Sequence, residues 1–168
     1  MKNREVVELF SRVADMLAIR GDQIHRILAY RKAAESIDAL GRDGKVIFAE
    51  GKLTEIPGIG DTLAAKIEEM LTTGRLAFYD KLAQEIPPGL VDMLRVEGLG
   101  PKRVKQVYET LQITTLDELT TAARAGKLDA RGDDHRGPGL DRQALETVHQ
   151  AHVGVQAEAG GDAAAECT

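Results

Sequence analysis

Residues 54–67 read TEIPGIGDTLAAKI, and residues 94–107 repeat the pattern as LRVEGLGPKRVKQV. In both copies an apolar residue and one variable residue precede a glycine, a second apolar residue and a second glycine. An amphipathic helical pattern follows. We predict two helix-hairpin-helix units, one turning at Gly58 and Gly60 and the other at Gly98 and Gly100.

The spacing of these glycines suits phosphate binding. Glycine lets the backbone turn tightly and approach another molecule, while the apolar residue between the pair, Ile59 or Leu99, anchors the turn in the core. The helix that follows begins with unpaired N–H groups, which bind phosphate oxygens with help from the helix dipole. One copy alone would fit an ordinary helix-to-helix turn equally well. Because the motif occurs twice with matched helices, we favour a pair of phosphate clamps.

The remaining pattern up to residue 127 is helical. Apolar residues recur at helical spacing, and no segment shows sustained period-two alternation. The expected helices cover residues 3–20, 23–40, 61–72, 76–85, 101–111 and 115–125. In the second helix, Ile24 and Leu28 are expected to be buried with Ile27, Ala34 and Ile37. The fold class predicted is all-α, with two tandem helix-hairpin-helix units in a small helical bundle: a domain over residues 1–85 and a second hairpin subdomain over 86–127.

Residues 128–168 differ from the rest in composition. They hold 3 basic and 8 acidic side chains, against 19 of each in residues 1–127. The segment RGPGL at 136–140 has the glycines of a third hairpin without its apolar anchors, and beyond Val153 there is almost nothing to bury. We therefore expect a degenerate third hairpin and a mostly disordered acidic tail. Because the excess acid lies in this tail, the neutral body can still bind a polyanion through a few well-placed contacts.

The composition also excludes several classes of protein. With 168 residues the chain forms one compact domain or two small ones, not a large multidomain enzyme. Its apolar stretches are too short for a membrane span or a secretory signal. The single cysteine, Cys167, completes neither a disulfide framework nor a thiolate zinc site. We expect a cytoplasmic protein that does not bind membranes and requires no cofactor.

Several blocks resemble the amino-terminal region of family X DNA polymerases, most closely the bacterial members. The resemblance covers roughly residues 2–127. It rests on HRILAYRKAA at 25–34, IPGIG at 56–60, AKIEE at 65–69, TGRL at 73–76, PPGL at 87–90 and GLGPK at 98–102.

The resemblance implies a role for each hairpin. The first belongs to a small lyase-type domain that binds the 5′-phosphate side of a DNA gap, and the second to a subdomain that grips the primer side. The positions that match contacts to the 5′ nucleotide are His25, Arg26 and Tyr30. Hairpin carbonyls that hold K⁺ or Na⁺ in the family match Thr54, Ile56 and Ile59 in the first copy and Leu94, Val96 and Leu99 in the second.

Basic side chains beside the hairpins are further candidates for DNA contact. Arg31 lies in the most basic stretch of the chain, and Lys102, Arg103 and Lys105 follow the second hairpin. These side chains fit solvated helix faces equally well. His25 and Tyr30 have similar alternatives, as a surface histidine and as a buried aromatic residue.

Lys66 matches the lysine that forms a Schiff base in some members of the family. To attack an abasic aldehyde its amine must be neutral, so its pKa must lie below the usual value of about 10.4. Burial and the positive Arg26 would lower this pKa, whereas Glu68 or Glu69 would raise it. The alternative is an ordinary solvated lysine paired with Glu69.

Two substitutions and a missing region distinguish the chain from this family. Thr62, a candidate for DNA contact at the start of a helix, stands where the family has a lysine, and Phe78 stands at another basic position. Bacterial members usually continue into a palm and a phosphoesterase domain, and here the pattern is lost near residue 128. We therefore expect a truncated polymerase with no polymerase activity.

The function predicted from the sequence is sequence-independent binding of gapped, nicked or 5′-phosphorylated DNA in base excision repair. Removal of 5′-deoxyribose phosphate through Lys66 is an expectation from the resemblance. The alternatives are a non-catalytic DNA adaptor and a protein-interaction domain. We expect a monomer at the bacterial nucleoid.

Overall fold

A computed structural model describes residues 1–125 and Leu128, and every regular element in this part is helical. The all-α prediction is confirmed. The degenerate third hairpin, the acidic tail and Cys167 lie outside the described residues. The chain divides into two compact units, residues 1–86 and residues from 87 onward. Within the described part, no helix is long and apolar enough to cross a membrane.

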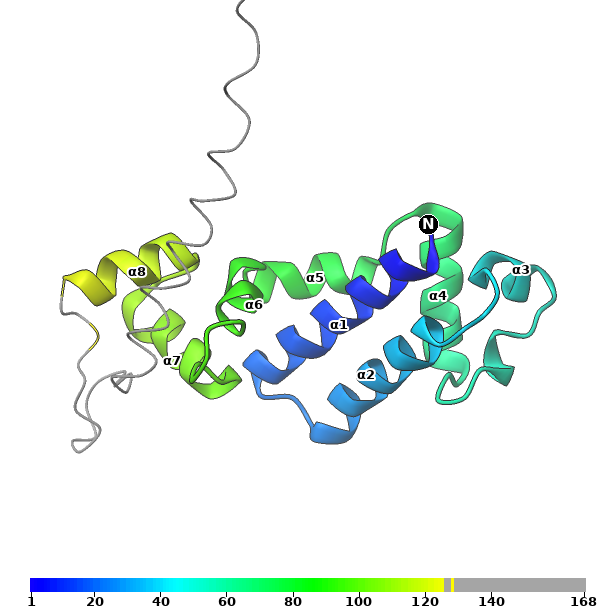
Figure 1. The fold of residues 1–168 in the computed structure, drawn as a ribbon, viewed down its shortest axis with the longest axis horizontal. Helices are drawn as coiled ribbons and strands as arrows, with labels where there is room; N and C mark the ends of the chain where they lie inside the picture. Colours follow the sequence, from blue (N-terminus) through cyan, green and yellow to red (C-terminus); the bar gives the residue numbers. More distant parts are fainter. Residues whose placement is uncertain (126–127, 129–168) are drawn as a thin grey trace, which may run out of the picture. The chain divides into compact units, whose positions relative to one another are not determined.

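The first unit is built around a pair of helices, α1 (Asn3–Arg20) and α2 (Ile24–Asp38), which lie side by side (Figure 1). α1 ends where Gly21 adopts a left-handed conformation, with φ 85°, and its amide donates to the carbonyls of Leu17 and Ala18. The fully buried Phe10 packs edge-on against Tyr30 of α2. The unit continues through α3 (Gly44–Ala49), the 3₁₀ turn η1 (Leu53–Glu55), α4 (Asp61–Thr73) and α5 (Ala77–Glu85).

The burial expected for two residues of α2 is wrong. Ile24 is 67% exposed and Leu28 is 53% exposed. The buried face of α2 runs through Ile27, Tyr30 and Ile37. At about 100° per residue, Leu28 points to nearly the opposite side of the helix. The apolar residues of this helix therefore cover a wider arc of its surface than the face that packs against the core.

The short helix α3 was not predicted, because six residues carry too little periodicity. It is held by polar contacts instead. Asp43 caps it by accepting from the Lys45 amide at 2.9 Å. The Asn3 side chain accepts from the Gly44 amide at 2.7 Å and donates to the Arg42 carbonyl at 2.9 Å. Asn3 thus fixes the segment that leads into the first hairpin.

The second unit contains α6 (Gly89–Met93), α7 (Pro101–Leu111) and α8 (Leu116–Arg124). Leu90, Met93 and Leu119 are fully buried in it. A Cβ on Gly89 would lie 2.2 Å from the Thr114 carbonyl oxygen, so only glycine fits where α6 meets this segment. α8 starts with a capping box between Thr115 and Glu118.

Candidate nucleic-acid interface

The two glycine hairpins have the same backbone conformation. Gly58 and Gly98 are left-handed, with φ of 82° and 84°. The amide of Ile59 donates to the Ile56 carbonyl at 3.0 Å, and the corresponding bond from Leu99 to the Val96 carbonyl is also 3.0 Å. The apolar residue between the glycines is buried in both copies. The sequence repeat is therefore a structural repeat.

The second glycine of each pair faces open space. Gly60 and Gly100 are the N-caps of α4 and α7, and a Cβ built on either meets nothing within 4 Å. A Cβ on Gly58 would instead lie 3.0 Å from Cγ of Lys32. The aliphatic stem of Lys32 thus covers the first hairpin and brings its ammonium group beside it.

The amides that start α4 and α7 follow these glycines. The first helical hydrogen bond in α4 runs from the Ala64 amide to the Gly60 carbonyl, so the amides of residues 61–63 precede it. In α7 the corresponding bond is donated by Val104, and Pro101 at the first helical position has no N–H. Thr62 is exposed at the second position of α4. The first hairpin thus offers one more amide than the second, but Asp61 adds a negative charge there.

Lys66, Arg26 and Tyr30 meet at a residue that was not counted among the candidates, Phe78 of α5. The Lys66 Nζ lies 4.5 Å from the centroid of the Phe78 ring, and the Arg26 guanidinium carbon lies 5.4 Å from it. Tyr30 stacks on the same ring, with centroids 6.1 Å apart and planes 7° apart. Tyr30 itself is 3% exposed. Two cations and two aromatic rings therefore form one cluster.

The pKa of Lys66 lies below its ordinary value. Burial is the largest cause, Glu69 raises the pKa by its negative charge, and Arg26 lowers it by its positive charge. These are the influences weighed from the sequence, with Phe78 added as a neighbour. Lys66 is half-buried and unlike a fully solvated lysine.

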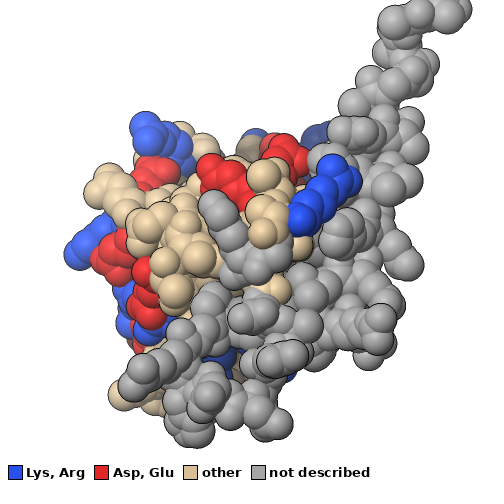
Figure 2. All heavy atoms as spheres, turned by 90° about the vertical axis from the view of Figure 1, so that its left-hand side faces the viewer, with Lys and Arg blue, Asp and Glu red and all other residues tan. Residues whose placement is uncertain are grey.

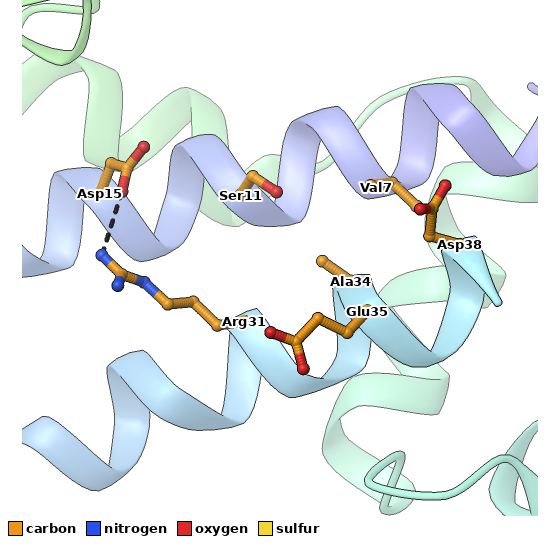
Figure 3. A pocket seen from close by; sticks show the side chains of 7 residues that line it. All are labelled: Val7, Ser11, Asp15, Arg31, Ala34, Glu35 and Asp38. Carbon is orange, nitrogen blue, oxygen red and sulfur yellow. Dashed lines mark hydrogen bonds and ion pairs between the residues drawn. The ribbon is translucent and has the colours of Figure 1, made fainter. Parts of the chain in front are cut away.

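The other candidates on α2 have different surroundings. His25 is exposed, and Arg26 forms an ion pair with Asp22 at 3.4 Å. Arg31 points into a groove of about 260 Å³ between α1 and α2, where it pairs with Asp15 at 3.3 Å (Figure 3). Partial burial raises the pKa of Asp15, and Arg31 lowers it. Arg31 is thus engaged by α1 and is not part of the Phe78 cluster.

Basic residues after the second hairpin also make local contacts. Arg103 donates from Nη1 to the Gly98 carbonyl at 3.1 Å and so braces the hairpin it follows. Lys105 lies 3.9 Å from Glu109, one helical turn away. Lys102 is exposed on the first turn of α7.

The carbonyls proposed for a monovalent cation lie at the two hairpins. Thr54 belongs to η1, and Leu94 is the C-cap residue of α6. The Ile56 and Val96 carbonyls each accept one hydrogen bond within their hairpin, which leaves a second lone pair on each oxygen. Backbone carbonyl oxygens are donors of the kind that a hard cation takes. In the described residues no group of three His, Cys, Asp or Glu side chains forms a metal site.

Basic and acidic side chains are interspersed on the face shown in Figure 2, as far as the described residues cover it. No continuous basic surface is seen there. This agrees with a neutral body whose binding depends on particular contacts.

Two residues of the interface were not assigned from the sequence. Lys32 lies in the block HRILAYRKAA at 25–34, but its contact with Gly58 depends on the packing of α2 against the hairpin. Phe78 stood out only because the family has a basic residue at this position. Its position between Arg26 and Lys66 joins α2, α4 and α5, which no local pattern encodes.

Comparison with known proteins identifies relatives over most of the chain. A family model described as a helix-hairpin-helix domain matches residues 1–76. The chain is 27% identical to the DNA polymerase/3′-5′ exonuclease PolX of Bacillus subtilis over 90% of its own length. It is 28% identical to DNA polymerase lambda of Rattus norvegicus over 92%, and 27% identical to that of Arabidopsis thaliana over 74%.

These matches confirm the resemblance to family X DNA polymerases. The chain spans about a quarter of the length of these relatives: 25%, 27% and 24% respectively.

Proposed function

We propose, for a chain that carries a helix-hairpin-helix domain and is similar to family X DNA polymerases, that it binds the sugar-phosphate backbone of gapped or nicked DNA during repair. The observation that supports this best is the identical hairpin geometry at Gly58–Gly60 and Gly98–Gly100, each with an open glycine before a helix start. Amide donors contact phosphate oxygens without reading bases, so binding is independent of sequence. The relatives are polymerases by name, which supports DNA as the partner.

The proposed role has consequences for assembly and location. Two hairpins in one chain are sufficient to contact two stretches of backbone, so we propose a monomer as the binding species. To reach chromosomal DNA, the protein would act in the bacterial cytoplasm, at the nucleoid. K⁺ or Na⁺ bound to the hairpin carbonyls would add positive charge at the phosphate and strengthen binding.

Titration with gapped DNA tests the binding proposal. The full chain, titrated at low ionic strength with a gapped duplex that carries a 5′-phosphate, is expected to shift the amide resonances of residues 61–63, 102 and 103. Affinity is expected to fall steeply with salt, because phosphate contacts release counterions. Unmoved resonances together with a flat salt dependence would instead support a protein-interaction domain.

We further propose that Lys66 removes 5′-deoxyribose phosphate. The neutral amine attacks C1′ of the open abasic sugar, water leaves, and a protonated imine joins Nζ to C1′. A base, which is water or a nearby carboxylate, takes a proton from C2′. The electrons of the C2′–H bond form a C2′=C3′ double bond, and the C3′–O bond breaks with its electron pair leaving on the phosphate oxygen. This releases the downstream strand with its 5′-phosphate. A second water molecule then hydrolyses the imine and frees the sugar phosphate and Lys66.

Borohydride trapping tests this chemistry. The reductant should link the chain to a 5′-deoxyribose phosphate substrate, and Lys66→Ala should lose at least nine-tenths of the adduct. Lys45→Ala, at an exposed lysine of α3, is the matched control and should keep it. Because the pKa of Lys66 is lowered, the yield of trapped adduct should rise at a lower pH than for a solvated lysine. An adduct that persists in Lys66→Ala contradicts the assignment.

A non-catalytic adaptor is the second candidate function, and one contact favours it. The Lys66 Nζ lies over the face of the Phe78 ring, a position that stabilises the protonated amine. In that form Lys66 is a phosphate contact rather than a nucleophile. Binding to gapped DNA without any borohydride adduct would identify the adaptor.

A further inference from the structure

One residue of the first unit is in contact with both cations of the candidate site. Phe78, in the first turn of α5, lies 4.5 Å from Lys66 Nζ and 5.4 Å from the Arg26 guanidinium carbon, measured to its ring centroid. These cations come from two other helices, α4 and α2. Both cations thus lie against the same ring.

The ring is held in place by the core. Tyr30 stacks on it and also contacts the ring of Phe10, which lies edge-on at 5.4 Å and is 0% exposed. The three rings form a row from the interior to the half-buried surface. Phe78 therefore has little freedom to turn when a cation or a ligand approaches.

The chemistry of the ring explains why it suits two like charges. Arg26 and Lys66 repel each other, and the charge of Arg26 is one cause of the lowered pKa of Lys66, after burial. The negative face of an aromatic ring attracts each cation. Unlike a carboxylate, it brings no charge that would neutralise them. A basic side chain at position 78 would add a third mutually repelling charge.

The nearby carboxylates have partners of their own. Asp22 accepts from the Gln23 amide at 2.9 Å and from Arg20, besides its longer contact with Arg26. Glu69 accepts from the Ala77 amide at 2.7 Å. Both carboxylates are thus engaged by other donors, which weakens their attraction for Arg26 and Lys66. An anionic ligand can therefore compete with them for the two cations.

We propose that Phe78 is a positioning residue that holds Arg26 and Lys66 together as a two-cation seat for a terminal 5′-phosphate. The inference rests on the proposed binding of broken DNA and adds the residue that holds the two cations in place. A terminal phosphate carries up to two negative charges at pH 7, with a second pKa near 6, whereas an internal phosphodiester carries one. Two cations gathered on a neutral ring match the dianion.

The test compares affinity for two gapped duplexes that differ only in a 5′-phosphate or a 5′-hydroxyl. The full chain is expected to prefer the phosphate, and the preference should weaken below about pH 6 as the phosphate takes up a proton. Replacing Phe78 by phenylalanine with one, two or more ring fluorines keeps the side chain's shape and weakens the ring's negative face. The preference should fall stepwise along this series. At the most fluorinated ring the loss should be roughly two- to fivefold for each cation contact.

Substitutions and a DNA-free measurement complete the experiment. Phe78→Leu should lower affinity for the 5′-phosphate duplex more than affinity for the 5′-hydroxyl duplex, and so lower the preference for the phosphate. Phe48→Leu, at a half-buried aromatic of α3, is the control and should change neither. Without DNA, the pKa of Lys66 measured by NMR should fall along the fluorine series, because the ring favours the charged amine.

The outcomes separate this inference from the proposed function. If the unmodified chain binds neither duplex, the proposed DNA binding has failed. If it binds both duplexes equally, or if the preference stays unchanged along the fluorine series, the role of Phe78 is overturned and DNA binding stands. Equal loss of affinity for both duplexes would likewise reduce Phe78 to a structural role.

Discussion

The two hairpins have the same backbone conformation, but the side chains around them differ. The first is covered by the stem of Lys32, and the helix after it begins with Asp61 and carries Lys66, which contacts Phe78. The second begins its helix with Pro101 and is braced by its own Arg103. The first thus draws its charges from several helices, whereas the second draws them from the helix it precedes.

This difference separates two properties of a DNA clamp. The conformation that presents amides to a phosphate is local and occurs twice because the glycine pattern occurs twice. Selectivity for a particular phosphate requires side chains that converge from distant segments, and Arg26 and Lys66 form such a convergence at Phe78 in the first unit. We infer that the second hairpin grips any backbone and that the first is suited to an end.

The largest effects are expected at the apolar anchors. Ile59 is 3% exposed and Leu99 is 4% exposed. Ile59→Ala and Leu99→Ala should each lower the free energy of unfolding by about 2–5 kcal/mol, the usual cost of emptying such a site. Hydrogen exchange should report the loss mainly in the unit that carries the substitution. Leu28→Ala, at an exposed position, should cost less than about 0.5 kcal/mol. Equal losses for Leu28 and Ile59 would contradict the burial pattern.

The left-handed glycines come next. Gly58→Ala and Gly98→Ala place a Cβ at φ of 82° and 84°, which should cost about 1–2 kcal/mol of stability in thermal or urea unfolding. The two should differ in their effect on DNA. At Gly58 the new methyl also displaces the Lys32 stem, so Gly58→Ala should weaken DNA binding more than Gly98→Ala does. The reverse order would mean that Lys32 is not part of the first clamp.

The sequence predicted features that depend on neighbouring residues better than features that depend on contacts between distant segments. Predicted helices at 61–72 and 101–111 match α4 (Asp61–Thr73) and α7 (Pro101–Leu111), because glycine, proline and apolar spacing fix these boundaries locally. α3 and α6 escaped prediction. They are too short for periodicity, and contacts with Asn3 and the Thr114 carbonyl define their surroundings.

The candidate site shows the same division. The glycines stood out from motif and spacing, whereas Lys66 stood out through the resemblance to family X DNA polymerases. The ring contacts of Phe78 join three helices and could not be read from any one segment. Leu28 was misassigned because an apolar residue in a helix was assumed to face the core, whereas the narrow packed face of α2 leaves it outside.

Methyl groups at the open glycines should affect binding without unfolding the chain. A Cβ on Gly60 or Gly100 meets no atom within 4 Å, and neither glycine is left-handed. Gly60→Ala and Gly100→Ala should therefore cost no more than about 1 kcal/mol of stability. The methyl would stand where a phosphate oxygen approaches the amides. Fluorescence anisotropy should show affinity falling about tenfold, or about 1.4 kcal/mol, as expected for weakened charge-assisted hydrogen bonds. Affinity that stays unchanged in both variants would refute the clamps.

The smallest effects should come from single charges and should distinguish the two hairpins most finely. Lys32→Met keeps an aliphatic stem over Gly58 and removes one positive charge, so the slope of log affinity against log salt should fall by about one with unchanged stability. Arg103→Met should lower the slope by a similar amount. Because it also removes the donor to the Gly98 carbonyl, it should cost the second unit about 0.5–1.5 kcal/mol of stability. A stability loss for Lys32→Met as large as for Arg103→Met would mean that both hairpins are braced in the same way.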